Sequence, residues 1–196
     1  MKRILLCLLA LLPLAGCESL PFARELESTM LVQVLGVDWN SEGVTLTAAS
    51  DPGEGGEDNG TAVISVSADD LDRAKTALKG AGEEYVSLTH VAQLVIGADT
   101  GLRDVLEAAL EDPALGQGAT VWLAETGAKE LLEGAGGGAK RLSSIELNNG
   151  IEPVTVLQSL SRLEETGQVD LPVLTLEGET LEPAGTTQIR EDAHGT

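Results

Sequence analysis

One of the two cysteines, Cys17, carries the most specific chemical signal in the chain. It follows Leu14-Ala15-Gly16 and a short apolar run, Ile4 to Leu12, with two basic residues ahead of the run. Positive charge, an apolar stretch and small residues, in that order, are typical of a segment that directs secretion and is then cleaved. Because a cysteine comes directly after the small residues, the pattern is a lipobox, whose thiol accepts a lipid before cleavage. The sequence therefore predicts a signal peptide over residues 1–16 and lipidation of Cys17.

Two other interpretations of this N-terminal segment are weaker. A transmembrane helix needs about 20 consecutive apolar residues, and residues 4–16 are too few. An ordinary secretory signal would place a small residue, not a cysteine, after the cleavage site. Residues 17–28 are therefore expected to be a lipidated tether that holds a folded domain outside the cytoplasmic membrane.

The charge of the chain excludes one class of partner. The formal net charge is −20, and the predicted signal peptide carries two basic residues and no acidic residue, so the mature chain would carry −22. A surface of this sign repels nucleic acid and anionic lipid head groups. No nucleic acid is therefore expected as a partner. Attachment to the membrane must come from the acyl chains on Cys17, since stable anchoring takes more than one apolar signal.

The residue types that could do catalysis are few. Cys7 lies in the predicted signal peptide, so Cys17 is the only cysteine of the mature chain, and neither a disulfide nor a cysteine metal site is expected. His90 has Ser87 and Thr89 beside it. A catalytic histidine needs a nucleophile and an orienting carboxylate, and nothing in the sequence brings these together, so a structural hydrogen-bonding role is favoured. We therefore expect no catalytic residue and no enzyme activity.

Two loops have compositions that could bind ions. The segment from Asp51 to Gly60 is acidic and could hold a hard cation such as Ca²⁺ weakly, but its spacing matches no EF-hand loop. The segment from Gly134 to Gly138 is expected to be a flexible loop, because a phosphate loop needs a strand before it and a Lys-Ser/Thr pair, which Lys140-Arg141 does not supply. No metal and no cofactor are therefore expected. The acidic side chains of the first loop are Asp51, Glu54, Glu57 and Asp58.

Apolar patterning predicts strands that alternate with helices. A nearly continuous apolar run from Met30 to Val37 suits a strand covered on both faces. Alternation from Val44 to Ala49 suits its hairpin partner, with a turn at Asp38 to Gly43. Further strands are expected at residues 63–66, 91–96, 119–124 and 173–176.

Four helices are expected between these strands. The first covers Ala68 to Ala81, the second ends at Asp112-Pro113, the third runs to Leu132, and Gly167 ends the fourth. Polar residues suited to an N-cap precede the first three, and a proline suits the first turn of the fourth. The residues expected to begin them are Ser67 or Asp69, Thr100, Thr126 and Pro153.

This alternation favours an α/β (α+β mixed) fold, with a mixed β-sheet flanked by helices in a single domain. The domain is expected over residues 29–176, which is long enough to bury a sizeable core. Residues 177–196 are polar and are expected to form a disordered acidic tail.

A series of short segments follows the lipobox in an informative order. They are Arg24-Glu25-Leu26, Gly36-Val37-Asp38, Ala62 to Val66 with the Leu71–Leu78 helix, Leu88-Thr89-His90 with Val91 to Gly97, Gly101 to Leu106 with Leu110 to Pro113, and Val121 to Ala124 with Ala128 to Leu132. In their order and spacing these segments resemble the N-terminal domain of the Ger(x)C family. That family comprises the C subunits of spore germinant receptors, which are lipoproteins of endospore-forming Firmicutes.

The chain departs from the family pattern at three places. Glu18-Ser19 stand where the family usually has Trp-Asp, Glu111 replaces the arginine before Asp-Pro, and Gly116 stands where a second arginine is common. Family members continue into two further α/β domains, so the resemblance covers the first domain only.

The resemblance implies a non-catalytic accessory or structural subunit of a spore germinant receptor. Its expected partners are membrane-spanning receptor subunits of the A type and the B type. Its expected place is the outer face of the cytoplasmic (inner spore) membrane, held by the lipid on Cys17.

The alternative is a stand-alone cell-envelope lipoprotein that binds a solute or an envelope component. Such binders usually have two lobes and an aromatic-lined cleft. A single domain with few aromatic residues argues against this alternative. The aromatic residues are Phe22, Trp39, Tyr85 and Trp122.

Overall fold

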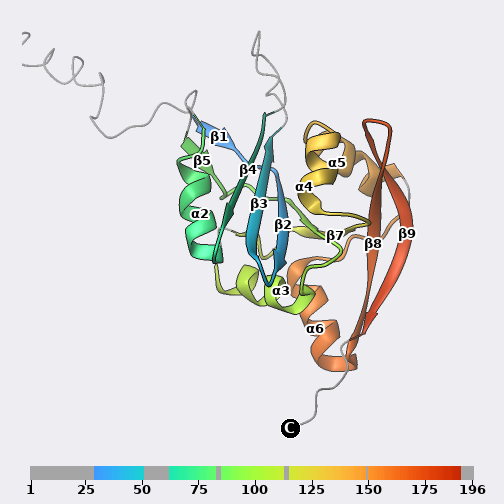
Figure 1. The fold of residues 1–196 in the computed structure, drawn as a ribbon. Helices are drawn as coiled ribbons and strands as arrows, with labels where there is room; N and C mark the ends of the chain where they lie inside the picture. Colours follow the sequence, from blue (N-terminus) through green and yellow to red (C-terminus); the bar gives the residue numbers. More distant parts are fainter. Residues whose placement is uncertain (1–28, 51–61, 83–84, 113–114, 149, 191–196) are drawn as a thin grey trace, which may run out of the picture.

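A seven-stranded mixed β-sheet runs through the centre of the fold (Figure 1). The computed structural model describes residues 29–50, 62–82, 85–112, 115–148 and 150–190. The strand order is β4-β3-β2-β6-β7-β8-β9, and β1 pairs with β5 in a separate two-stranded sheet. The strands are β1 (Thr29–Leu31), β2 (Val34–Asn40), β3 (Gly43–Ser50), β4 (Ala62–Ala68), β5 (Tyr85–Ser87), β6 (Gln93–Ile96), β7 (Thr120–Ala124), β8 (Gln168–Glu177) and β9 (Thr180–Arg190).

The inner strands of the main sheet are parallel. β2 pairs with β6, β6 with β7, and β7 with β8 in this direction, whereas β3, β4 and β9 run antiparallel to their neighbours. Parallel neighbours need crossover connections, which are usually helical. The helices in the described part of the chain are α2 (Leu71–Lys79), α3 (Leu102–Glu111), α4 (Ala128–Gly134), α5 (Ala139–Asn148) and α6 (Val156–Thr166).

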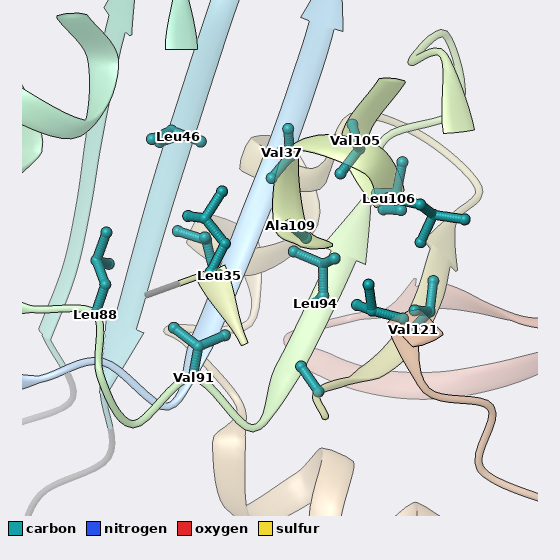
Figure 2. Packing of buried hydrophobic residues seen from close by; sticks show 14 of the residues in the cluster. Leu35, Val37, Leu46, Leu88, Val91, Leu94, Val105, Leu106, Ala109 and Val121 are labelled. Atoms are coloured by element: carbon teal, nitrogen blue, oxygen red, sulfur yellow. The ribbon is translucent and has the colours of Figure 1, made fainter. Parts of the chain in front are cut away.

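The helices cover both faces of the sheet and produce two apolar clusters. Residues of α2, α3 and α6 belong to the first cluster, and residues of α4 and α5 belong to the second. In β6, Leu94 and Ile96 belong to the first cluster and Val95 to the second, as expected from the alternation of side chains along a strand. Figure 2 shows the first cluster, where α3 packs on β2 and β6. The structure confirms the predicted single domain with a mixed sheet flanked by helices.

A buried hydrogen bond joins β6 to β7 on the side of the second apolar cluster. The indole Nε1 of Trp122 donates to Oε1 of Gln93 at 2.6 Å, and both residues are buried. Because a buried polar group without a partner is costly, each side chain allows the other to lie in the core. The pair explains why a glutamine stands within an otherwise apolar strand.

The end of α6 follows its sequence signals closely, while its start and that of α2 lie a few residues from their predicted positions. Gly167 ends α6 in the left-handed region, with φ 68°, as predicted. Thr155 begins it through a capping box with Gln158, so the prediction that Pro153 lies in the first turn is wrong. Asp70, not Ser67 or Asp69, caps α2, because its carboxylate accepts from the backbone N–H of Arg73 at 2.8 Å.

The predicted disordered tail over residues 177–196 is wrong for its described part. Thr180–Arg190 form β9, which pairs antiparallel with β8 along its whole length. Leu181 is only 1 % exposed in the second cluster, and Ile189 packs against the first. Two apolar residues so far apart give little signal in the sequence, whereas the pairing itself satisfies the backbone of β8. Residues 191–196 lie outside the described residues.

Three other predictions of local structure are also corrected. The apolar run from Met30 to Val37 contains two strands, because Val32 N donates to Ser87 O of the small sheet while Gln33 N donates to Ala49 O of the main sheet. Asp38 lies within β2 and not in the turn. β5 and α5 have no counterpart among the predicted elements.

We predict that Leu181→Ala lowers the free energy of unfolding by about 2–4 kcal/mol, because it removes a fully buried side chain and leaves a cavity. Urea unfolding followed by circular dichroism measures the change. Thr186→Ala, on the exposed part of β9, is the control and should change stability by less than about 0.5 kcal/mol. Equal effects of the two substitutions would show that β9 does not belong to the core.

Candidate functional site

Asp38, at the carboxyl end of β2, organises the start of α4. Its Oδ1 accepts from Ala128 N at 2.7 Å and its Oδ2 from Lys129 N at 2.9 Å. Gly127, at the N-cap position, has no side chain to do this, so a carboxylate 90 residues earlier in the chain replaces it. Negative charge at a helix N-terminus also interacts favourably with the helix dipole. The prediction that Thr126 caps this helix is therefore wrong.

Two glycines leave the space that this arrangement needs. A Cβ at Gly36 would come within 2.8 Å of Leu132 Cδ1, so this glycine lets α4 pack closely on β2. A Cβ at Gly97, which follows β6, would overlap Oδ1 of Asp38. The segments Gly36-Val37-Asp38 and Val91 to Gly97, which resemble one family in sequence, thus meet at one point of the structure.

Thr100 ties the loop after β6 to β2. Its Oγ1 accepts from Trp39 N at 2.9 Å and donates to Val37 O at 3.5 Å. The hydroxyl is therefore engaged, and α3 begins after Gly101 without a side-chain cap, contrary to the prediction that Thr100 caps it. One further bond, from Ala98 N to Thr126 O at 2.9 Å, joins the loop after β6 to the loop after β7.

A cleft of about 490 Å³ opens beside these loops. One wall is the loop after β6 together with Leu102 at the start of α3, and the second is the carboxyl end of β7 from Leu123 to Glu125. The third wall comes from the β8–β9 ribbon, with Val173 on β8 and Ile189 on β9. Both polar and apolar groups line this cleft, and it is the candidate site of the domain.

The predicted lipidation residue and the predicted acidic loop fall outside the described residues. Cys17 belongs to residues 1–28, and Asp51, Glu54, Glu57 and Asp58 belong to residues 51–61. Within the described ranges, no three histidine, cysteine, aspartate or glutamate side chains form a group that could hold a metal ion. No helix in those ranges is long and apolar enough to cross a bilayer.

His90 lies at the surface, ahead of β6 and away from the cleft. Its Nδ1 is 3.0 Å from Thr89 Oγ1, which is in turn 3.0 Å from Ser87 Oγ. The three side chains form a short hydrogen-bonded chain, and no carboxylate among the described residues joins it. The arrangement orders the entry to β6, and the described residues provide no third group that would orient the imidazole as a catalytic base.

The glycine run after α4 is a close-packed turn between two helices, where a flexible loop is predicted. Gly136, Gly137 and Gly138 have positive φ values of 61°, 108° and 87°. A Cβ at Gly138 would approach Leu181 Cδ1 of β9 to 2.5 Å, so the turn lies directly against the ribbon. Arg141 on α5 reinforces this contact, since its Nε donates to Leu181 O at 2.9 Å and it forms an ion pair with Glu182.

Lys75 links α2 to the residue that follows α3. Its Nζ lies 2.8 Å from Asp72 and 2.9 Å from Asp112, and its side chain is 15 % exposed. Burial lowers the pKa of Lys75, but hydrogen bonds to Asp72 and Asp112 and the charges of these carboxylates outweigh burial and raise the pKa above its usual value. Asp112 belongs to the Leu110 to Pro113 segment, so this motif residue also serves packing between elements.

The sequence of this chain matches the model of a known protein family. A family model described as the spore germination protein N-terminal domain matches residues 23–176, which is most of the chain. The match begins after Cys17 and ends within β8. No curated protein and no solved structure gives a significant match.

We predict that Asp38→Ala and Gly97→Ala are strongly coupled. Asp38→Ala should lower the free energy of unfolding by about 1–2 kcal/mol, because two backbone N–H groups of α4 lose their acceptor. Gly97→Ala should destabilise the native protein because the new Cβ overlaps the Asp38 carboxylate. In the Asp38→Ala background that overlap is gone, so Gly97→Ala should cost at least about 1 kcal/mol less there. Urea unfolding of the four proteins measures the coupling, and strictly additive effects would contradict the geometry.

We predict that Lys75→Met lowers the free energy of unfolding by about 1 kcal/mol at neutral pH, while Lys79→Met, on the exposed end of the same helix, has little effect. Since the pKa of Lys75 is raised in the folded state, its stabilising effect is complete below the unfolded-state pKa and is lost as pH rises through the folded-state pKa. Unfolding measured from pH 7 to strongly alkaline pH should show the two variants converging. A pH-independent difference would argue against the ion pairs.

Proposed function

Since this chain belongs to the family of the spore germination protein N-terminal domain, we propose that it acts as a lipid-anchored, non-catalytic subunit of a spore germinant receptor. Family membership itself supports a role in spore germination. The proposal goes beyond family membership in three respects: the attachment by lipid, the accessory role and the receptor partners. The match over residues 23–176 is the observation that carries it.

The structural roles of the motif residues support a non-catalytic subunit. Gly36, Asp38 and Gly97 hold α4 against the sheet, and Asp112 holds α2 against α3. These residues stabilise the packing of the domain. A rigid domain of this kind suits a role in holding other subunits, namely the membrane-spanning A-type and B-type subunits of the receptor.

The lipid anchor would place the domain close to the membrane. Eleven residues lie between Cys17 and Thr29, where β1 begins, so twelve Cα–Cα steps join the two. A fully extended chain of that length spans at most about 40 Å. With a mature charge of −22, the domain would be repelled by anionic head groups and would face the receptor subunits instead. The proposed location is the outer face of the cytoplasmic (inner spore) membrane.

A stand-alone binding lipoprotein is the second candidate, and the cleft beside β6 and β7 is the observation that favours it. The two candidates differ in what the loss of the protein does to germination. They share the lipid anchor, which therefore needs a test of its own.

We predict that Cys17→Ser releases the protein into the soluble fraction, because the hydroxyl is not lipidated and no other anchor is proposed. Fractionation of cells with detection by immunoblot measures the distribution. Cys7→Ser, which changes the cysteine of the predicted signal peptide, is the matched control and should remain in the membrane fraction. If Cys17→Ser also stays with the membrane, the lipoprotein proposal is wrong.

We predict that deletion of the gene impairs germination in response to nutrients and leaves the yield of spores unchanged. The fall in optical density and the release of spore contents after nutrient addition measure germination. Restoring the wild-type gene should restore the response, and restoring Cys17→Ser should do so poorly. Normal nutrient germination in the deletion strain, with no paralogue present, would favour the stand-alone binding lipoprotein.

A further inference from the structure

The cleft of about 490 Å³ lies where the topology itself opens a crevice. After β6 the chain continues into α3, on the face of the sheet that carries the first apolar cluster. After β7 it continues into α4, on the face that carries the second cluster. Loops that depart to opposite faces from neighbouring parallel strands leave a gap outside the carboxyl ends of those strands, and ligands of α/β sheets bind in such gaps. The volume also falls within the usual range for small-molecule sites.

The third wall has a local irregularity that shapes the cleft. The pairing of β8 with β9 shifts between Val173 and Leu174, so Ala184 is an extra residue on β9. Both Val173 and Ala184 line the cleft. A β-bulge bends its strand and redirects side chains, and bulges are common beside binding sites.

The chemistry of the lining is amphipathic. Apolar side chains make up most of the lining, and Thr187 of β9, which lies on the same face of the strand as Ile189, adds a hydroxyl group. Glu125 is the one charged residue of the lining, and its backbone is fixed by a bond from its N–H to Leu174 O at 2.9 Å. Neither the Glu125 carboxylate nor the Thr187 hydroxyl has a partner among the described residues. The largest apolar side chains are Leu102, Leu123, Val173 and Ile189.

We propose that this cleft binds a small organic cation, an ammonium group on an apolar body, with Glu125 as the counter-ion of the ammonium. The apolar side chains would cover the body of the ligand, and the Thr187 hydroxyl would accept one of the remaining N–H groups. The strongly negative charge of the chain raises the local concentration of cations and acts against carboxylate ligands. The proposal does not rest on the role in a germinant receptor, because it concerns binding to the isolated chain.

Three probes of six carbons each separate the contributions of the head group: n-hexylammonium, n-hexanol and n-hexanoate. The protein is the full chain with Cys17→Ser, so that no lipid or detergent competes for the cleft. Amide resonances of the purified protein are followed by NMR during each titration. Hexylammonium should bind most tightly, hexanoate least, and the shifts should gather at residues 97–102, 123–125 and 184–189.

Two glutamine substitutions of equal charge separate a direct ion pair from general attraction. Glu125→Gln should weaken the binding of hexylammonium about tenfold and leave the binding of hexanol unchanged. Glu130 is an exposed residue of α4 outside the cleft, so Glu130→Gln should weaken the binding of hexylammonium less than twofold. Ala184→Leu, which narrows the cleft, should weaken both hexylammonium and hexanol. Equal effects of Glu125→Gln and Glu130→Gln, binding of hexanoate as tight as that of hexylammonium, or shifts gathered elsewhere would each overturn the proposal.

Discussion

The contact between the Asp38 carboxylate and the first two N–H groups of α4 is the interaction on which this fold depends. It joins the inner strand β2 to α4, a helix on the side of the second apolar cluster. The free N–H groups of a helix start need acceptors, and here the helix has a glycine at the position that usually provides one. β2 thus provides both the surface on which α4 packs and the carboxylate that caps it, and this fixes the position of α4 along the strand.

The packing around this contact tolerates little additional volume. Gly36 allows Leu132 of α4 to reach the backbone of β2, and Gly97 allows the carboxylate to lie beside the end of β6. Because interiors are close-packed, one added methyl group at either place must move a neighbour. Residues of two segments that resemble the family in sequence therefore bring three elements together, and the cleft lies beside them.

Sequence patterns were informative where one element determines the outcome. The apolar runs of β6 and β7 and the hairpin of β2 and β3 can be read from the chain, as can the glycine that ends α6. Sequence patterns gave wrong predictions where a residue far away in the chain makes the decisive contact. Thr126 is a reasonable cap by type, but Asp38 takes that role, and Thr100 has its hydroxyl bound to β2.

The last strand and the cleft could not be predicted for a related reason. β9 has only two apolar anchors, and its other side chains look like those of a loop, so its order comes from pairing with β8. The cleft needs loops from both faces and the bulge in β9, none of which has a sequence signature. Gln93 with Trp122 is similar, since each residue is explained only by the other.

The strand order has a consequence for how the protein assembles. β2, β3 and β4 form a meander, and then β6, β7, β8 and β9 are added one after another on the free side of β2. No strand of the main sheet has to insert between two strands that are already paired. A chain that emerges with its N-terminus first can therefore extend the sheet one strand at a time, because each new strand pairs with an edge strand that has already formed. The Asp38 carboxylate would already be in place on β2 when α4 emerges, so the topology is suited to vectorial folding.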